Sequence, residues 1–251
     1  MRAVTLHRDV LVATSRVYQT TCTAIRSGEE GFVVDSPIFP DELELLPAVL
    51  QQAGFPVSGL LATHGDWDHM LGRLAFPGAA LGVAETTAAY LTAEPGDVQR
   101  KLREWDEEHY VERPEPLSLG QVQALPVPGF ISIGEHELEV QPADGHTADG
   151  MALWVPWARV LVCGDYLSPV EIPMLSASGS RDAYLATLER LRPWVEAAHW
   201  VVPGHGAPID GRRAIAILNE DVRYLTEWEL PLARRTVAQR EIDELNRERT
   251  A

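Results

Sequence analysis

The stretch "LLATHGDWDHMLG", residues 60–72, constrains the fold of this chain more than any other. It begins as an apolar run and then places four metal-ligand side chains within six positions, at His64, Asp66, Asp68 and His69. Alternate residues of an extended chain point to the same side, so His64, Asp66 and Asp68 can face one site. Asp68 could instead cap the following helix by accepting backbone N–H bonds. Together with its neighbours, however, it favours a metal site at the end of a short buried strand.

Three later segments repeat this pattern of a histidine or aspartate beside glycine. They are "DGHTADG", "VCGDYL" and "VPGHGAP", which contain His146, Asp165 and His205. Each flanks a strand-like run, and active sites of layered α/β proteins are built on loops at strand ends. The glycines allow sharp backbone turns beside a ligand. The sequence therefore predicts one site assembled from four strand ends.

The order of expected elements indicates an α/β fold with a mixed sheet covered by helices. Apolar and β-branched patterns predict strands within 4–14, 17–36, 58–63, 131–163 and 199–203. Helices are expected at 41–53, at 84–112 with a break at Pro95–Gly96, at 181–191 and at 211–229. The proline-rich residues 113–130 are expected to form a loop. The tail should form another helix, so we expect one domain over 1–251 with C-terminal helices from about 211.

Composition narrows the function classes. The formal net charge of −16 argues against partners that are nucleic acids or anionic membranes. The apolar runs are too short to cross a bilayer, and the N-terminus lacks a signal-peptide pattern, so we expect a cytoplasmic protein. Cys22 and Cys163 are expected to be buried small hydrophobes, with a disulfide as the alternative.

The order of these motifs resembles the metallo-β-lactamase superfamily. The signature of that family is H-x-H-x-D-H, followed by a Gly-His, a Gly-Asp and a final Gly-His. The order and the flanking glycines match from residue 64 to residue 205. The resemblance implies a four-layer αββα sandwich with the site at one edge of the sheets.

The resemblance also implies a binuclear metal centre. His64, Asp66 and His146 would form the first metal site, Asp68, His69 and His205 the second, and Asp165 would bridge the two. The implied cofactors are two divalent metal ions, with zinc preferred and manganese or iron as alternatives.

Asp66 departs from the family signature, which has histidine at this position. Either Asp66 is a working ligand, which we favour, or the first site is impaired. A third carboxylate would leave the centre about neutral, which makes it a weaker Lewis acid and more tolerant of harder metals. The flavodiiron relatives carry a glutamate at the same position, which keeps iron under consideration.

The resemblance implies a metal-dependent hydrolase that uses metal-bound hydroxide on a small molecule. An ester, thioester, lactone or phosphodiester suits this chemistry. Asp68 could also orient the nucleophile or handle its proton. The alternatives are a di-iron protein of oxygen or nitric oxide chemistry and a non-catalytic binding module.

Several residues could set substrate specificity, and each has two interpretations, one in the site and one purely structural. Trp67 lines the site or packs in the core, and Tyr166 either donates to an oxyanion or is a core tyrosine. The 166–180 loop, with Met174 and Leu175, either contacts substrate or packs as an ordinary loop. The helix at 97–110 is a lid or a surface helix, and a homodimer is left open. The remaining histidines are expected to be structural or surface residues: His7, His109, His136 and His199.

Overall fold

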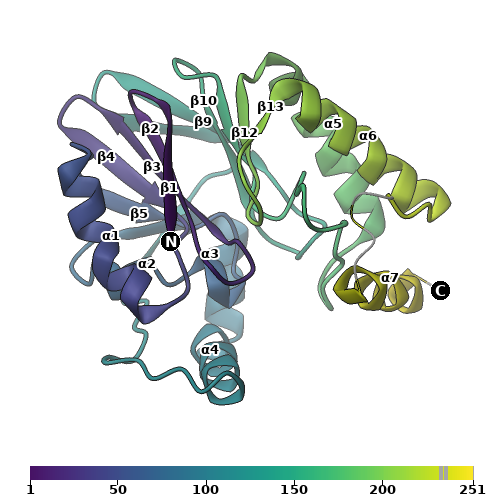
Figure 1. Ribbon diagram of the computed structural model, residues 1–251, viewed down its shortest axis with the longest axis horizontal. Helices are drawn as coiled ribbons and strands as arrows, with labels where there is room; N and C mark the ends of the chain where they lie inside the picture. Colours follow the sequence, from purple (N-terminus) through teal and green to yellow (C-terminus); the bar gives the residue numbers. More distant parts are fainter. Residues whose placement is uncertain (232–233, 235–236, 251) are drawn as a thin grey trace.

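Two β-sheets pack face to face at the centre of the molecule, and helices cover the outer face of each (Figure 1). The structure is a computed structural model that describes residues 1–231, 234 and 237–250. The first sheet follows chain order, with antiparallel pairs up to β4 and parallel pairs from β4 to β7. Its strands are β1 (Arg2–His7), β2 (Val10–Thr14), β3 (Thr21–Ser27), β4 (Glu30–Val34), β5 (Gly59–Leu61), β6 (Leu81–Ala84) and β7 (Val122–Leu125).

The second sheet runs in the reverse order, β13-β12-β11-β10-β9-β8, and its one parallel pair in the described chain is β11 with β12. Its strands are β8 (Gly129–Ile133), β9 (His136–Pro142), β10 (Met151–Val155), β11 (Val160–Val162), β12 (Trp200–Val202) and β13 (Ile209–Asp210). Strands β10, β11 and the end of β12 are buried on both sides. This is why they appear in the sequence as continuous apolar runs.

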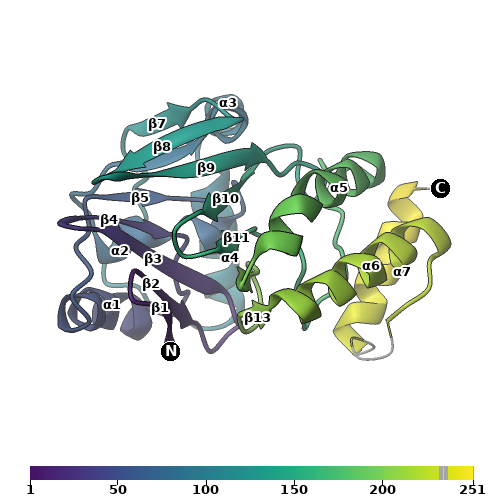
Figure 2. The same ribbon diagram turned by 90° about the horizontal axis from the view of Figure 1, so that it is seen from above.

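Helices lie outside both sheets, as Figures 1 and 2 show from two directions. They are α1 (Pro40–Gln52), the short η1 (Trp67–His69), α2 (Gly72–Ala75), α3 (Glu85–Ala93), α4 (Asp97–Glu108), α5 (Arg181–Ala197), α6 (Gly211–Glu227) and α7 (Val237–Thr250). Ser180 caps α5 and Asp210 caps α6, since each side chain accepts a backbone N–H of the first turn. Within the described residues, none of these helices is both long and apolar enough to span a membrane.

Three apolar cores fill the spaces between the layers. One lies between the sheets and includes Ile25, Val140 and Leu153. A second packs α1 and α4 against the first sheet, and a third packs α5 and α6 against the second sheet. The expected four-layer αββα sandwich with C-terminal helices is therefore confirmed.

The expectation of a loop over 113–130 was wrong in part, since residues 113–121 lie outside any helix or strand but a strand follows them. Strand β7 occupies Val122–Leu125 and pairs in parallel with β6, and β8 begins at Gly129. The prolines of this region flank β7 rather than interrupt it, and β7 is an edge strand that has one neighbour in its sheet. The break expected at Pro95–Gly96 is confirmed, because Gly96 adopts a left-handed conformation, φ 82°, between α3 and α4.

Candidate metal centre

The site lies where strands of both sheets end. Asp35 follows β4, His64 follows β5, Asp165 follows β11 and His205 follows β12. The carboxyl ends of parallel strands meet at one edge, and the bridge between Thr20 and His205 joins the two sheets there. The fold therefore brings together segments that lie far apart in the sequence.

The predicted residues form two groups that share Asp165. His64, Asp66 and His146 converge as one possible metal-holding triad, and Asp68, His69 and His205 converge as another. Asp165 lies between the triads. Its Oδ2 is 3.3 Å from both His146 Nε2 and His205 Nε2, and its Oδ1 is 3.1 Å from His69 Nε2. A third convergent group, His64, His69 and Asp165, links the two triads, so all seven side chains named from the sequence lie in one site.

Local backbone geometry explains how one short motif serves both triads. Asp66 is extended, with φ −70° and ψ 141°, and it precedes the single turn η1. Asp68 and His69 lie within η1 and are turned toward the second group. Asp68 does not occupy the capping position, which belongs to Asp66, so its capping alternative is not seen.

The glycines beside the ligands are required by space. Gly164 has φ 56°, which allows the chain to turn directly before Asp165. A Cβ at Gly204 would collide with the Asp165 carboxylate. These two glycines let the backbone approach the centre closely.

Each histidine of the centre is held from outside through its Nδ1 atom. His69 Nδ1 lies 3.0 Å from Asp35 Oδ2, and His64 Nδ1 lies 3.0 Å from Thr63 Oγ1. His146 Nδ1 and His205 Nδ1 donate to backbone oxygens, of Met174 at 2.8 Å and of Tyr18 at 2.9 Å. The four Nε2 atoms therefore point inward, the arrangement typical of histidine metal ligands.

Buried nitrogen and oxygen atoms that lack a hydrogen-bond partner indicate whether this centre fits a metal. His64 Nε2, His69 Nε2 and Asp165 Oδ1 are buried, and none of them makes a hydrogen bond of good geometry among the described residues, although His69 Nε2 and Asp165 Oδ1 are 3.1 Å apart. Buried polar groups left unpaired are costly, so these atoms call for another partner. Imidazole nitrogens and carboxylate oxygens are ligands for zinc, manganese and iron. The residues present thus fit a pair of divalent metals.

The carboxylates of the centre are held in their charged form. Burial favours the neutral acid at Asp66, yet the hydrogen bond with His146 and the nearby His64 imidazole hold the pKa of Asp66 well below the usual range. Burial also opposes charge at Asp165, but His205 and the neighbouring histidines hold the pKa of this carboxyl well below the usual range.

The histidines respond in the opposite direction. Burial disfavours an imidazolium, but Asp66 and Asp165 raise the pKa of His146 to about 9. Asp165 and Glu171 likewise outweigh burial and raise the pKa of His205 to about 10. The site is a strongly negative environment that stabilises positive charge, whether the charge is carried by protons or by metal ions.

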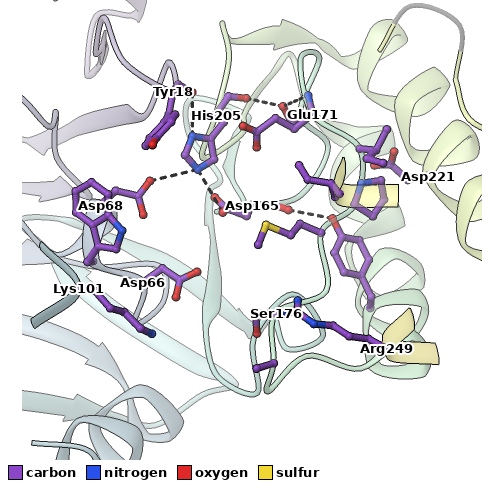
Figure 3. Close-up of a pocket in the computed structure, with 18 of the residues that line it drawn as sticks. Tyr18, Asp66, Asp68, Lys101, Asp165, Glu171, Ser176, His205, Asp221 and Arg249 are labelled. Carbon is purple, nitrogen blue, oxygen red and sulfur yellow. Dashed lines mark hydrogen bonds and ion pairs between the residues drawn. The ribbon is translucent and has the colours of Figure 1, made fainter. Parts of the chain in front are cut away.

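A cavity of about 490 Å³ opens onto the centre (Figure 3). Trp67 lines this cavity and also packs against Trp105. Both interpretations of Trp67, as a site residue and as a packing residue, are therefore correct. Helix α4 contributes Lys101 and Trp105 to the lining, and the 166–180 loop contributes Met174 among other residues. Leu175 of the same loop is buried in a core.

Tyr166 is a core tyrosine, the second of its two interpretations. Its hydroxyl accepts the backbone N–H of His146 and donates to the oxygen of Asp144. It is not among the described residues that line the cavity. The remaining four histidines lie outside the His/Asp groups of the described chain, as expected. Cys22 and Cys163 are both buried and unpaired, so the disulfide alternative is not seen.

Two acidic residues near the site were missed by sequence reasoning. Asp35 holds His69 and also accepts the backbone N–H and the hydroxyl of Thr63. Its signal was available, because "GFVVDS" places an aspartate directly after a strand. Glu171 extends into the cavity, where burial raises the pKa of its carboxyl. Nothing in its sequence context separates it from a surface glutamate.

The comparisons with known proteins agree with this architecture. The family model described as the metallo-beta-lactamase superfamily matches residues 15–205. A metallo-beta-lactamase from Pontibacter korlensis is 20% identical, with a TM-score of 0.64, 87% of this chain covered and 98% of that chain. The DIM-1 metallo-beta-lactamase is 19% identical, with a TM-score of 0.63 over 91% of this chain and 98% of that chain.

A protein named TTHA1623, solved in a di-iron-bound form, is 21% identical, with a TM-score of 0.63, 81% of this chain covered and 96% of that chain. At these identities the structural likeness shows the fold alone. The family match extends over most of the chain and includes all four motif segments. The chain therefore belongs to the metallo-β-lactamase superfamily.

Proposed function

We propose that this protein is a metal-dependent hydrolase with a binuclear centre that acts on a small-molecule ester, thioester, lactone or phosphodiester. The observation that carries the proposal is the pair of donor triads around Asp165, in which the inward-facing Nε2 atoms of His64 and His69 have no hydrogen-bond partner among the described residues.

In this proposal His64, Asp66 and His146 hold one ion, and Asp68, His69 and His205 hold the other. Asp165 lies between them and serves both. Zinc is the preferred metal, because nitrogen and carboxylate donors are its usual ligands, and manganese and iron remain alternatives. When bound, such a pair supplies Lewis acidity and lowers the pKa of a coordinated water.

Asp68 has a second role in the proposal. Its Oδ2 lies 3.5 Å from His205 Nε2 and accepts the Thr20 hydroxyl at 3.5 Å. Both separations are long, so this carboxylate is weakly constrained compared with Asp165. It lines the cavity and can accept the proton of an attacking water or orient that water.

The cavity lining indicates the chemistry of the substrate. Trp67, Ile172 and Met174 offer apolar surface, and Lys101, which pairs with Asp97, and Arg249 add two positive groups to the lining. This combination suits a substrate with an apolar part and an anionic part. We place the reaction in the cytoplasm, with a small molecule as the partner.

A di-iron redox role is the second candidate. Asp66 gives the centre a third carboxylate, and hard oxygen donors suit iron. The protein TTHA1623, of similar fold, has been solved with two irons. An oxygen-sensitive visible spectrum of the iron-loaded protein, without turnover of any ester, would favour this role.

A panel of anionic and neutral esters, thioesters, lactones and phosphodiesters tests the hydrolase proposal. The zinc-, manganese- and iron-loaded protein should turn over at least one class. Asp68→Asn should lower kcat by at least 100-fold, as expected for loss of a general base. His199→Asn is the matched control, because His199 is exposed and outside the cluster, and it should leave kcat unchanged. No turnover above that of Asp68→Asn by any loaded form would contradict the proposal.

A further inference from the structure

The backbone of residues 171–176 lies between helix α7 and His146 without belonging to a helix or a strand. Backbone N–H and C=O groups that are buried need partners, and regular secondary structure cannot supply them in this segment. Ile172, Pro173 and Leu175 are nevertheless buried. The partners must therefore come from side chains or from backbone groups elsewhere in the chain.

Helix α7 supplies these partners from one of its faces. Gln239 Oε1 accepts the N–H of Ile172 at 2.5 Å, and Asn246 Oδ1 accepts the N–H of Leu175 at 2.8 Å. Asn246 Nδ2 donates to the oxygen of Pro173 at 2.7 Å. Residues seven positions apart lie on the same helix face, so the spacing of these two amides matches the segment they hold.

A third side chain of helix α7, Arg249, also bonds to the backbone of this segment. Arg249 Nη1 donates to the oxygen of Leu175. Asn246 is 0% exposed and Gln239 is 5% exposed, so both amides are committed to the interior. Burying an amide without hydrogen-bond partners is costly. An apolar surface would offer Gln239 and Asn246 no partners, whereas the backbone of residues 171–176 does.

The opposite side of the same segment holds His146. The imidazole Nδ1 donates to the oxygen of Met174 at 2.8 Å, and the Ser176 N–H donates to the His146 oxygen at 2.8 Å. A carbonyl oxygen can only accept, so this bond places the hydrogen on Nδ1. In neutral His146 the Nε2 lone pair then faces Asp66 and Asp165, whose Oδ2 atoms are 3.1 Å and 3.3 Å away.

We propose that α7 is a positioning element for the first metal site, and that it acts on His146 through the 171–176 segment. Asn246 fixes the peptides on both sides of Met174, and the Met174 oxygen fixes the imidazole. The family model ends at residue 205, so this support comes from a part of the chain outside the family match. The inference rests on the proposed function only in taking His146 as a metal ligand.

Zinc affinity tests the inference without any substrate. Metal-free wild type and variants are titrated with zinc in competition with a chromophoric chelator. Asn246→Ala should weaken one of the two zinc sites about tenfold, the lower end of the usual effect of outer ligand partners. Cobalt(II) substitution should show altered d–d absorption bands in the same variant, because the imidazole orientation changes.

Arg247→Ala is the matched control on the same helix. Arg247 pairs with Asp243 and donates to the Trp228 oxygen, so its loss loosens α7 without touching the 171–176 segment. It should lower thermal stability yet leave zinc affinity and the cobalt spectrum within twofold of wild type. Gln239→Ala, which removes the acceptor of the Ile172 N–H, serves if Asn246→Ala does not fold, and its zinc affinity should also fall.

Equal zinc affinities in wild type and in a folded Asn246→Ala or Gln239→Ala would overturn the inference while leaving the proposed function intact. A wild type that binds no zinc, manganese or iron would contradict both together.

Discussion

Asp66 reaches the centre although it is shorter than the histidine of the family signature. Its Oδ2 lies 3.1 Å from His146 Nε2 and 3.7 Å from His64 Nε2. It is also part of a convergent triad with these two histidines. This placement supports our preference for Asp66 as a working ligand over an impaired first site.

Asp35 accepts the His69 Nδ1 proton and so leaves His69 Nε2 free to bind metal. In Asp35→Asn the amide can place an NH₂ where Oδ2 accepted the His69 Nδ1 proton. We expect zinc affinity of one site to fall by about 10- to 100-fold, the usual effect of removing such a partner. Competition with a chromophoric chelator measures it.

Asp149→Asn is the control for this substitution. Asp149 is a buried carboxylate beside the motif that accepts from Gly65 and Thr87 and bonds to none of the four histidines in the described structure. Its substitution should leave zinc affinity within about twofold. If both variants lost affinity equally, the role of Asp35 would be wrong.

At the scale of elements, a buried carboxylate ties α1 to the end of β2. Glu42 accepts hydrogen bonds from the Ser15 hydroxyl at 2.6 Å and from the Arg16 backbone at 3.0 Å. Burial raises the pKa of Glu42, but the Met1 amino group, Ser15 and Arg16 together lower it below the ordinary value of 4.5. A depressed pKa stabilises the fold above about pH 4.5, and this contribution disappears as the pH falls through the folded-state pKa.

Glu42→Gln should therefore lower the free energy of unfolding by about 2 kcal/mol at pH 7, as for the loss of charge-assisted hydrogen bonds. The difference from wild type should shrink as the pH falls below 4.5. Urea unfolding at a series of pH values measures it. A difference that is constant with pH would show that the charge of Glu42 does not contribute.

A second buried charge ties the 168–171 turn to α6. The Arg234 side chain is 0% exposed, pairs with Asp221 at 2.6 Å and with Glu220 at 3.1 Å, and donates to the oxygen of Glu171 at 2.8 Å. Arg234→Ala leaves Asp221 buried without its partner, so we expect a loss of about 3–5 kcal/mol in the free energy of unfolding. The double variant Arg234→Met, Asp221→Leu should recover much of that loss, because it removes both charges. Equal losses in the single and double variants would contradict the ion-pair account.

Sequence reasoning was strongest where chemistry and periodicity coincide. The motif residues from His64 to His205 are brought together, because strand ends of both sheets meet at one edge. It failed at Val122–Leu125, where flanking prolines masked the edge strand β7. It could not foresee the contacts of Gln239 and Asn246, because an amide on a helix face carries no sign of which distant backbone it will bond.

At the scale of the whole molecule, the carboxylates of the centre place negative charges close together, and bound metal ions would neutralise them. Asp66, Asp68 and Asp165 converge beside Glu171 within a protein of net charge −16. Ligands that bind only the folded state stabilise it, by about 2.7 kcal/mol at a hundredfold excess over Kd. For a chain of this size that corresponds to a Tm shift of about 5–10 °C.

EDTA should accordingly lower Tm by about 5–10 °C, and added zinc should restore it. Differential scanning calorimetry measures the shift, and EDTA already saturated with zinc is the control for direct effects of the chelator. An unchanged Tm after verified removal of metal would show that the centre does not stabilise the fold.

The most direct test of the paired metal centre is metal content, measured by inductively coupled plasma mass spectrometry on protein purified without added metal or chelator. We predict two metal ions per chain for wild type, about one for Asp66→Ala and two for His199→Asn. A wild type with one ion or none, or an Asp66→Ala variant that still holds two, would contradict a paired centre in which Asp66 is a ligand.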